Sequence, residues 1–175
     1  MKRTKALNLV QIPLMTVIII LCSWITIPLP IPLTFQTFGI YCALLLLGGK
    51  AGTLSLLLYI LLGTAGLPVF SGFSAGMGHL IAPTGGYIWG FLLCAVFYLC
   101  TEKIADKSTP LQILILSVGT LLCYTAGTLW FVFSIFTSHS LWQAAVICVF
   151  PFIIPDLLKI LFATYISKKL KPLIR

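Results

Sequence analysis

The chain has 175 residues and a net charge of +8, with 60% hydrophobic and only 8% charged residues and a mean hydropathy of +1.14. Water-soluble domains carry about a quarter charged residues, so this composition excludes a soluble globular protein and predicts one compact domain, residues 1–175, in a lipid bilayer. The basic residues stand in short tracts beside apolar runs, as topology signals do, and we therefore expect no nucleic-acid binding.

The apolar runs predict an all-α integral membrane protein, because about 20 helical residues cross a bilayer and somewhat fewer suffice where it is thin. The first run follows a basic start but offers no small-x-small cleavage site, so we expect a retained helix rather than a signal peptide. Three prolines that come after it, Pro28, Pro30 and Pro32, are incompatible with regular helix. The predicted helices cover residues 6–25, 33–48, 51–66, 85–101, 109–136 and 141–166, the last with a break near 151–155.

The second and third of these helices could also be one long helix over residues 37–63. Both ends of the chain are basic, and the positive-inside rule places both in the cytoplasm, which requires an even number of crossings. Two short helices of about 16 residues, each about 24 Å long, give six crossings and place Lys50 at a cytoplasmic turn. Ten of the eleven basic residues then fall on the inner side. The eleventh is Lys159.

Two ionisable side chains, Asp156 and Lys159, lie inside the last apolar run. An ionised group at membrane depth costs at least a few kcal/mol and usually marks a ligand or ion pathway. Pro151 and Pro155 predict a broken helix that restarts near Asp156 as its N-cap, with Lys159 one turn later on the same face. Such helix N-termini bind anionic substrate groups in transporters. A structural ion pair that closes the helix break is the alternative, and the two interpretations are compatible.

A long outer segment, residues 67–87, is rich in glycine and aromatic residues. Its glycines allow the backbone to approach a ligand closely, and Phe70, Phe73 and Tyr87 can cover an apolar ligand body. The alternative is an outer loop without a ligand role.

Several other residues near this segment are weaker candidates. His79 is more typical of a hydrogen-bonding loop residue than of a metal ligand, and the spacing of Gly86 and Gly90 favours helix packing. Polar residues that follow the proline-rich segment are candidates for lining the same outer cavity: Thr34, Gln36 and Thr37.

Other chemistry finds little support. The six cysteines lie in apolar runs without a C-x-x-C motif, which favours small buried hydrophobic residues over disulfides or metal ligands. The sequence contains no G-x-x-x-x-G-K-[ST] loop for ATP, no H-E-x-x-H and no G-x-S-x-G. An intramembrane enzyme that uses Asp156 or Lys159 has no second catalytic group in reach, so we expect no enzyme activity and no metal site.

The chain resembles the BioY family, the biotin-specific substrate-binding (S) components of energy-coupling factor (ECF) transporters. The most specific resemblance is Pro83-Thr84-Gly85-Gly86-Tyr87 after the glycine-rich segment. S components often carry small residues four apart on the first helix, where the coupling protein docks, whereas residues 8–16 here contain a proline and no such pair. The other segments that carry the resemblance are residues 31–37, 54–70, 90–91, 127–130 and 151–159.

The resemblance implies six helices with cytoplasmic termini, in the plasma membrane of a prokaryote, and a biotin pocket near the outer face that is capped by loops. It implies a transmembrane coupling protein and two ATP-binding subunits as partners, with biotin as the transported ligand and no cofactor. A self-sufficient carrier of a small organic anion, with Lys159 as its counter-ion, is the alternative function. The predicted biotin-binding residues are Asp156, Lys159, Tyr87, Gly85, Gly86, Thr84, Phe70, His79 and Gln36.

Overall fold

The computed structural model describes residues 2–27, 32–134 and 141–174, with side chains from residue 9 to residue 172 of these ranges. The described residues form eight α-helices, one short 3₁₀-helix and one antiparallel pair of two-residue strands. In chain order the elements are α1 (Lys2–Trp24), β1 (Thr26–Ile27), β2 (Leu33–Thr34), α2 (Gln36–Leu47), α3 (Gly49–Thr64), η1 (Ser71–Phe73), α4 (Gly78–Ile81), α5 (Gly85–Ala105), α6 (Thr109–Phe133), α7 (Leu141–Cys148) and α8 (Phe150–Ile174).

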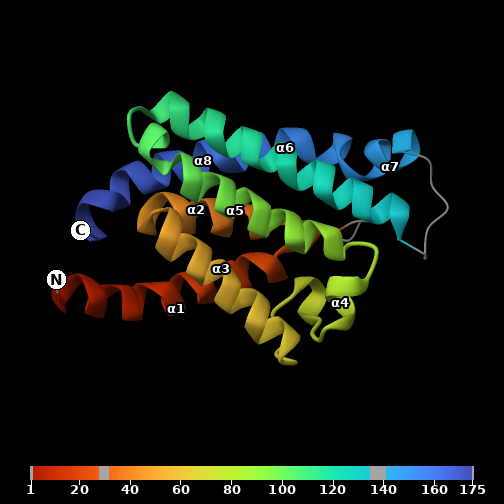
Figure 1. Cartoon of the computed structure of the whole chain (residues 1–175), viewed down its shortest axis with the longest axis horizontal. Helices are drawn as coiled ribbons and strands as arrows, with labels where there is room; N and C mark the ends of the chain where they lie inside the picture. The colour runs from red at the N-terminus through yellow and green to blue at the C-terminus, as the bar shows by residue number, and fades with distance from the viewer. Residues whose placement is uncertain (1, 28–31, 135–140, 175) are drawn as a thin grey trace.

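The longer helices run side by side, and the two ends of the resulting bundle differ (Figure 1). One end holds both chain termini, the turn between α2 and α3 and the link between α5 and α6. The other end holds α4 and α7. Three helices are long and apolar enough to cross a membrane, α5, α6 and the Phe150–Pro172 part of α8, and α1, α2 and α3 contribute shorter apolar stretches. The chain is therefore a multi-pass helical membrane protein.

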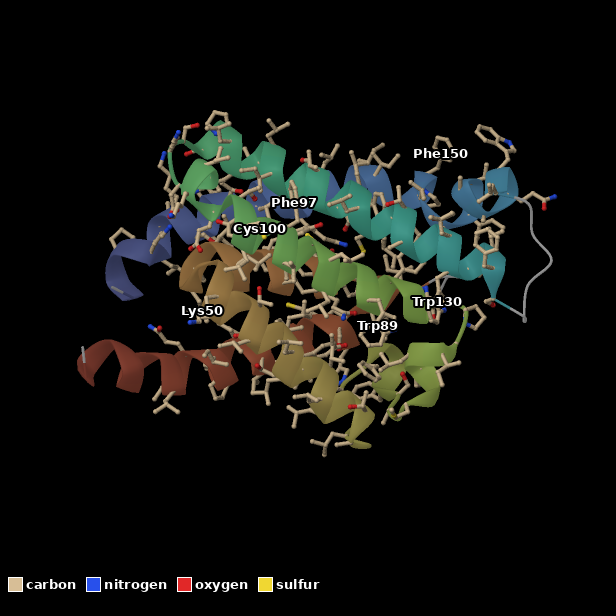
Figure 2. All side chains as sticks on the ribbon, viewed as in Figure 1. Lys50, Trp89, Phe97, Cys100, Trp130 and Phe150 are labelled. Carbon is tan, nitrogen blue, oxygen red and sulfur yellow. The ribbon has the colours of Figure 1, made fainter. Side chains whose placement is uncertain are left out.

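The predicted split of the middle stretch into two helices is confirmed, because α2 ends at Leu47 and α3 begins at Gly49. Gly48 between them has a φ of 87°, in the left-handed region that residues with a Cβ rarely adopt. The two helices then pack closely, since a Cβ on Gly52 would lie 2.8 Å from the Cα of Leu44. Lys50 is exposed and lies toward the end of the bundle that holds the termini (Figure 2).

Helix α2 lies at the centre of the packing, in contact with α1, α3, α5 and α8. Three-quarters of its residues are buried, including Tyr41 and Leu44. Around it, α5 and α6 pack against each other through glycines: Gly86 lies against Trp130, and a Cβ on Gly90 would lie 2.8 Å from the Sγ of Cys123. The predicted packing role of this glycine pair is confirmed. All six cysteines are free. Five of them are buried, as expected for small hydrophobic residues, and Cys100 is exposed.

The break in the last segment lies earlier than residues 151–155. Helix α7 ends at Cys148 and α8 begins at Phe150, so Val149 separates them. Pro151 is the second residue of α8, where a backbone N–H has no helical partner to lose, so the proline fits without a break. Pro155 lies inside α8 and removes one hydrogen bond of the helix, which membrane helices tolerate.

This course of α8 corrects two expectations. Asp156 lies inside the helix and is not its N-cap, so its carboxylate is directed at other side chains instead of at free N–H groups of its own helix. The helix also continues to Ile174 rather than ending near residue 166. Lysine is a good helix former and is favourable near a helix C-terminus, so the basic tract from Lys168 to Lys171 extends the helix rather than ending it.

Candidate functional site

A cavity of about 210 Å³ lies between α2, α3, α5, α6, α7, α8 and the segment that precedes α5. A water molecule in the liquid occupies about 30 Å³, so the cavity has room for a small organic molecule. Its wall combines aromatic and aliphatic side chains with a few polar groups, the usual composition of a small-molecule site. The polar groups are concentrated where α2, α6 and α8 meet.

The ion pair Asp156–Lys159 forms the charged part of this wall. The two residues are 3% and 6% exposed, and Lys159 Nζ lies 2.7 Å from Asp156 Oδ1. Three residues separate them on α8, so they project from the same face of the helix. The desolvation cost of a buried ion pair is offset only where further hydrogen bonds satisfy both partners, and both have such bonds here.

Asp156 accepts hydrogen bonds on both carboxylate oxygens. Thr37 Oγ1 donates to Oδ1 at 2.8 Å, and the Tyr124 hydroxyl donates to Oδ2 at 2.6 Å. With the bond from Lys159, Oδ1 has two donors and Oδ2 has one. Because each carboxylate oxygen has about two lone-pair sites, Oδ2 can accept one more N–H or O–H from a ligand.

Lys159 uses all three of its protons within the protein. Its Nζ donates to the Thr34 carbonyl at 2.8 Å, to Thr37 Oγ1 at 3.0 Å and to Asp156. The ring centroid of Phe35 lies 6.0 Å from the same nitrogen. A ligand oxygen that binds Lys159 must therefore replace one of these acceptors. The Thr34 carbonyl is an acceptor that a ligand oxygen can replace, because it belongs to the short strand β2 rather than to the helical bundle.

Hydroxyl pairs extend the polar wall away from the charges. The Tyr41 hydroxyl lies 2.6 Å from Thr120 Oγ1, which also donates to the Leu116 carbonyl at 2.8 Å. Since Thr120 has a single hydroxyl proton, Tyr41 is then the donor of the pair, and its oxygen can accept from a ligand. On the α3 side, Gln36 Nε2 donates to the Tyr59 hydroxyl at 3.1 Å.

Aromatic rings close the side of the cavity formed by the segment before α5. Phe70 is 3% exposed, packs directly on Gly63 of α3, and meets Tyr59 edge-on with ring centroids 5.6 Å apart. The His79 ring lies 5.9 Å from Phe70. Tyr87, in the first turn of α5, packs against Gly127, and its hydroxyl lies 3.2 Å from Thr128 Oγ1. These contacts fix the positions of the rings in the cavity wall.

The structure brings most of the predicted site residues to this one cavity. Seven of the nine line it: Gln36, Phe70, His79, Thr84, Tyr87, Asp156 and Lys159. Thr34 and Thr37, weaker candidates from the sequence, line it as well. Whether these residues contact the ligand stays a prediction.

Three residues with an expected ligand role lie elsewhere. Gly85 and Gly86 are not among the residues that line the cavity, because they pack against the Leu80 carbonyl and against Trp130. Phe73 is 62% exposed and packs on Trp24, with ring centroids 4.8 Å apart. The glycine-rich segment thus contributes the side chains of Phe70, His79 and Thr84 to the cavity wall. The backbone of its glycines at the start of α5 is not part of this wall.

Sequence reasoning missed three tyrosines of the cavity wall, one of which, Tyr124, donates to Asp156. Tyr41, Tyr59 and Tyr124 line the cavity from α2, α3 and α6. A usable signal was present: each of these tyrosines lies inside an apolar run, and a buried tyrosine hydroxyl usually requires a hydrogen-bond partner. Searching the membrane segments for hydroxyls, and not for charges alone, finds these residues.

The arrangement favours binding over chemistry. The cavity offers one carboxylate, one ammonium group and several hydroxyls. Among the described residues, no three His, Cys, Asp or Glu side chains gather in a way that could hold a metal ion. A ligand with an apolar body and complementary polar groups matches this wall.

Comparison with known proteins gives one consistent result. The profile of the family described as "BioY family" matches residues 1–175. The chain is 37% identical over 168 residues to "Biotin transporter BioY" from Thermotoga maritima, covering 95% of this chain and 96% of the relative. It is 35% identical over 167 residues to "Biotin transporter BioY2" from Lactococcus lactis, covering 94% and 90%.

A solved structure has the same fold. It is the crystal structure described as that of "the S-component for biotin from an ECF-type ABC transporter", which matches with a TM-score of 0.88 and 26% sequence identity. The match covers 98% of this chain and 94% of that one. Agreement over nearly the full length extends to the helices that build the cavity.

Proposed function

The chain belongs to the BioY family, and from this premise we propose that its cavity binds biotin and that it is the substrate-binding S component of an ECF-type importer. The similar proteins are transporters by name, which is consistent with a wall that offers binding groups and no catalytic arrangement. The observation that carries the proposal is the buried pair of Asp156 and Lys159 on the wall of the cavity.

The chemistry of biotin matches this wall. Biotin has a fused bicycle with an apolar body, a ureido group with two N–H donors and one carbonyl, and a carboxylate. Asp156 Oδ2 has room to accept a ureido N–H, and Lys159 can neutralise a polar end of the ligand if it exchanges one of its protein acceptors for a ligand oxygen. Phe70 and Tyr87 supply flat apolar surface for the bicycle.

We propose six membrane crossings with both termini in the cytoplasm of a prokaryotic cell. The termini, Lys50 and the α5–α6 link share one end of the bundle (Figures 1 and 2), and basic residues accumulate on the cytoplasmic side of membrane proteins. The cavity then opens toward the outer face. The similar solved structure is described as the S-component for biotin of an ECF-type ABC transporter, and we infer from this likeness that a transmembrane coupling protein and two ATP-binding subunits supply the energy for uptake.

Uptake of labelled biotin tests this proposal against a self-sufficient carrier. Cells that lack their own biotin uptake express this chain alone, with the partner subunits, or with partner subunits whose ATP-binding lysines are replaced. We expect full uptake only with intact partners, and unchanged biotin binding by the purified chain in every case. Full uptake by the chain alone favours the carrier, and co-purification of a different vitamin contradicts the substrate.

Thr37→Val is expected to weaken biotin binding by about 5- to 30-fold. The Thr37 hydroxyl accepts from Lys159 and donates to Asp156, so its loss removes two bonds from charged groups, each worth roughly 1.5–3 kcal/mol but partly replaced by rearrangement. Titration calorimetry on the purified variant measures the effect. The matched control is Thr125→Val on the exposed side of α6, where the hydroxyl contacts only the backbone of its own helix. Equal affinities of the two variants would show that Thr37 does not organise the site.

A further inference from the structure

A second cavity, of about 460 Å³, lies at the end of the bundle that holds the chain termini. It is an open hollow, lined by the α5–α6 link, the first turn of α6 and the last turns of α8. It shares no lining residue with the biotin cavity. Nothing in the proposed binding of biotin uses it.

The electrostatic balance of this second cavity is positive. Lys107, Lys168 and Lys171 line it, and Asp106 is the one acidic residue in its wall. Lys171 Nζ lies 3.1 Å from Asp106 Oδ1, which leaves a net charge of two on the lining side chains. The N-terminus of α6, a helix of 25 residues, adds partial positive charge on the same side. Three lysines and a helix N-terminus around one hollow attract an anion.

Ser167 gives independent evidence for a missing partner. It lines the cavity and is 4% exposed, and among the described side chains its Oγ is the one buried polar atom without a hydrogen bond. Thr164, one turn earlier on α8, donates instead to the Ile160 carbonyl at 2.7 Å. Buried hydroxyls in native proteins almost always have a partner, and an unsatisfied one requires an explanation. An acceptor oxygen of a ligand bound in the cavity would be the missing partner of the Ser167 hydroxyl.

We propose that this cavity binds the phosphate group of an anionic ligand, with Lys107, Lys168 and Lys171 as counter-charges and Ser167 as a hydrogen-bond donor. Basic pockets between helices on the cytoplasmic side of membrane proteins bind phospholipid headgroups. A phosphate presents several acceptor oxygens, which suits three ammonium groups and one hydroxyl. The phosphate can belong to an anionic lipid or to a free anion, and the two sources share this recognition chemistry.

Native mass spectrometry of the purified full chain in uncharged detergent tests the proposal. The probes are phosphatidylglycerol, phosphatidylcholine of the same chain length, and inorganic phosphate. We expect phosphatidylglycerol to bind at least about tenfold more tightly than phosphatidylcholine. Inorganic phosphate that competes with phosphatidylglycerol assigns the site to a free phosphate group, whereas its failure to compete assigns the site to the lipid headgroup. Both results support the proposal.

Variants locate the binding. The triple variant Lys107→Gln, Lys168→Gln, Lys171→Gln should lose at least about tenfold in phosphatidylglycerol affinity, and Ser167→Ala a few-fold. Lys169→Gln is the matched control, because Lys169 is the adjacent lysine but its Nζ lies over the Tyr165 ring, 4.7 Å from the centroid, and does not line the cavity. It should bind the lipid as the unmodified chain does.

Biotin titration of the same variants separates this proposal from the biotin site and reports whether they fold. Biotin affinity should be unchanged in all of them. If the triple variant fails to fold, Ser167→Ala and Lys168→Gln alone carry the test. Equal binding of the two lipids, or undiminished lipid binding by these variants, would overturn the proposal.

Discussion

Asp156→Ala is expected to weaken biotin binding by about 30- to 5,000-fold, the range for removing one partner of a desolvated, charged hydrogen bond, about 2–5 kcal/mol. The carboxylate is the one acidic group that lines the cavity, and it receives bonds from Thr37, Tyr124 and Lys159. Its loss removes the acceptor for the ligand and leaves Lys159 with an unpaired charge. Titration calorimetry with the purified variant measures the change.

The matched control for this prediction is Asp106→Ala. Asp106 is also an acid paired with a lysine, but it is exposed and lies at the opposite end of the bundle from α4. Its replacement should leave biotin affinity within about twofold, because exposed ion pairs contribute roughly 0–1 kcal/mol and this one does not reach the biotin cavity. A loss of affinity that is equal in both variants would contradict the assignment of Asp156 to the site.

The helices of this fold were largely predictable because each leaves a local signal in the sequence. Gly48 and Lys50 mark the turn between α2 and α3, and the charged link before α6 marks the end of α5. Proline was the misleading signal. Pro151 and Pro155 predicted a break at their own positions, but a proline fits the first turn of a helix and is tolerated inside a membrane helix. Val149, where the chain does break, carries no local signal.

The site was predictable in part, for a related reason. The charges of Asp156 and Lys159 inside an apolar run identified these residues. The free-energy cost of placing an ionised side chain in a membrane can be recognised from the sequence alone, without knowledge of the fold. The hydroxyl network depends instead on how distant helices rotate relative to one another: Tyr41 and Thr120 are 79 residues apart, and Tyr124 meets Asp156 across two helices. No periodicity in the sequence specifies that rotation, since every face of these helices is apolar and either protein or lipid can cover it.

A double replacement distinguishes a ligand-binding pair from one that only closes the helix packing. Lys159→Met alone leaves the Asp156 carboxylate buried without its cation, and breaking a buried pair in this way destabilises a protein by about 3–5 kcal/mol. Asp156→Asn alone leaves Lys159 unpaired, with a similar cost. The double variant Asp156→Asn, Lys159→Met removes both charges. The new amide oxygen can still accept from Tyr124, and the amide NH2 group can donate to the Thr37 hydroxyl, which no longer accepts from Lys159. We expect the double variant to be closer in stability to the unmodified chain than either single variant is.

Biotin binding should follow the opposite pattern and stay lost in the double variant, because the ligand needs the charged acceptor and donor that both replacements remove. Thermal unfolding in detergent and biotin titration on the same four proteins give the two readouts. A purely structural pair would let the double variant recover affinity together with stability. Destabilisation equal to the sum of the two single effects would instead show that the charges do not depend on each other, and the 2.7 Å contact between Lys159 and Asp156 would then have no energetic role.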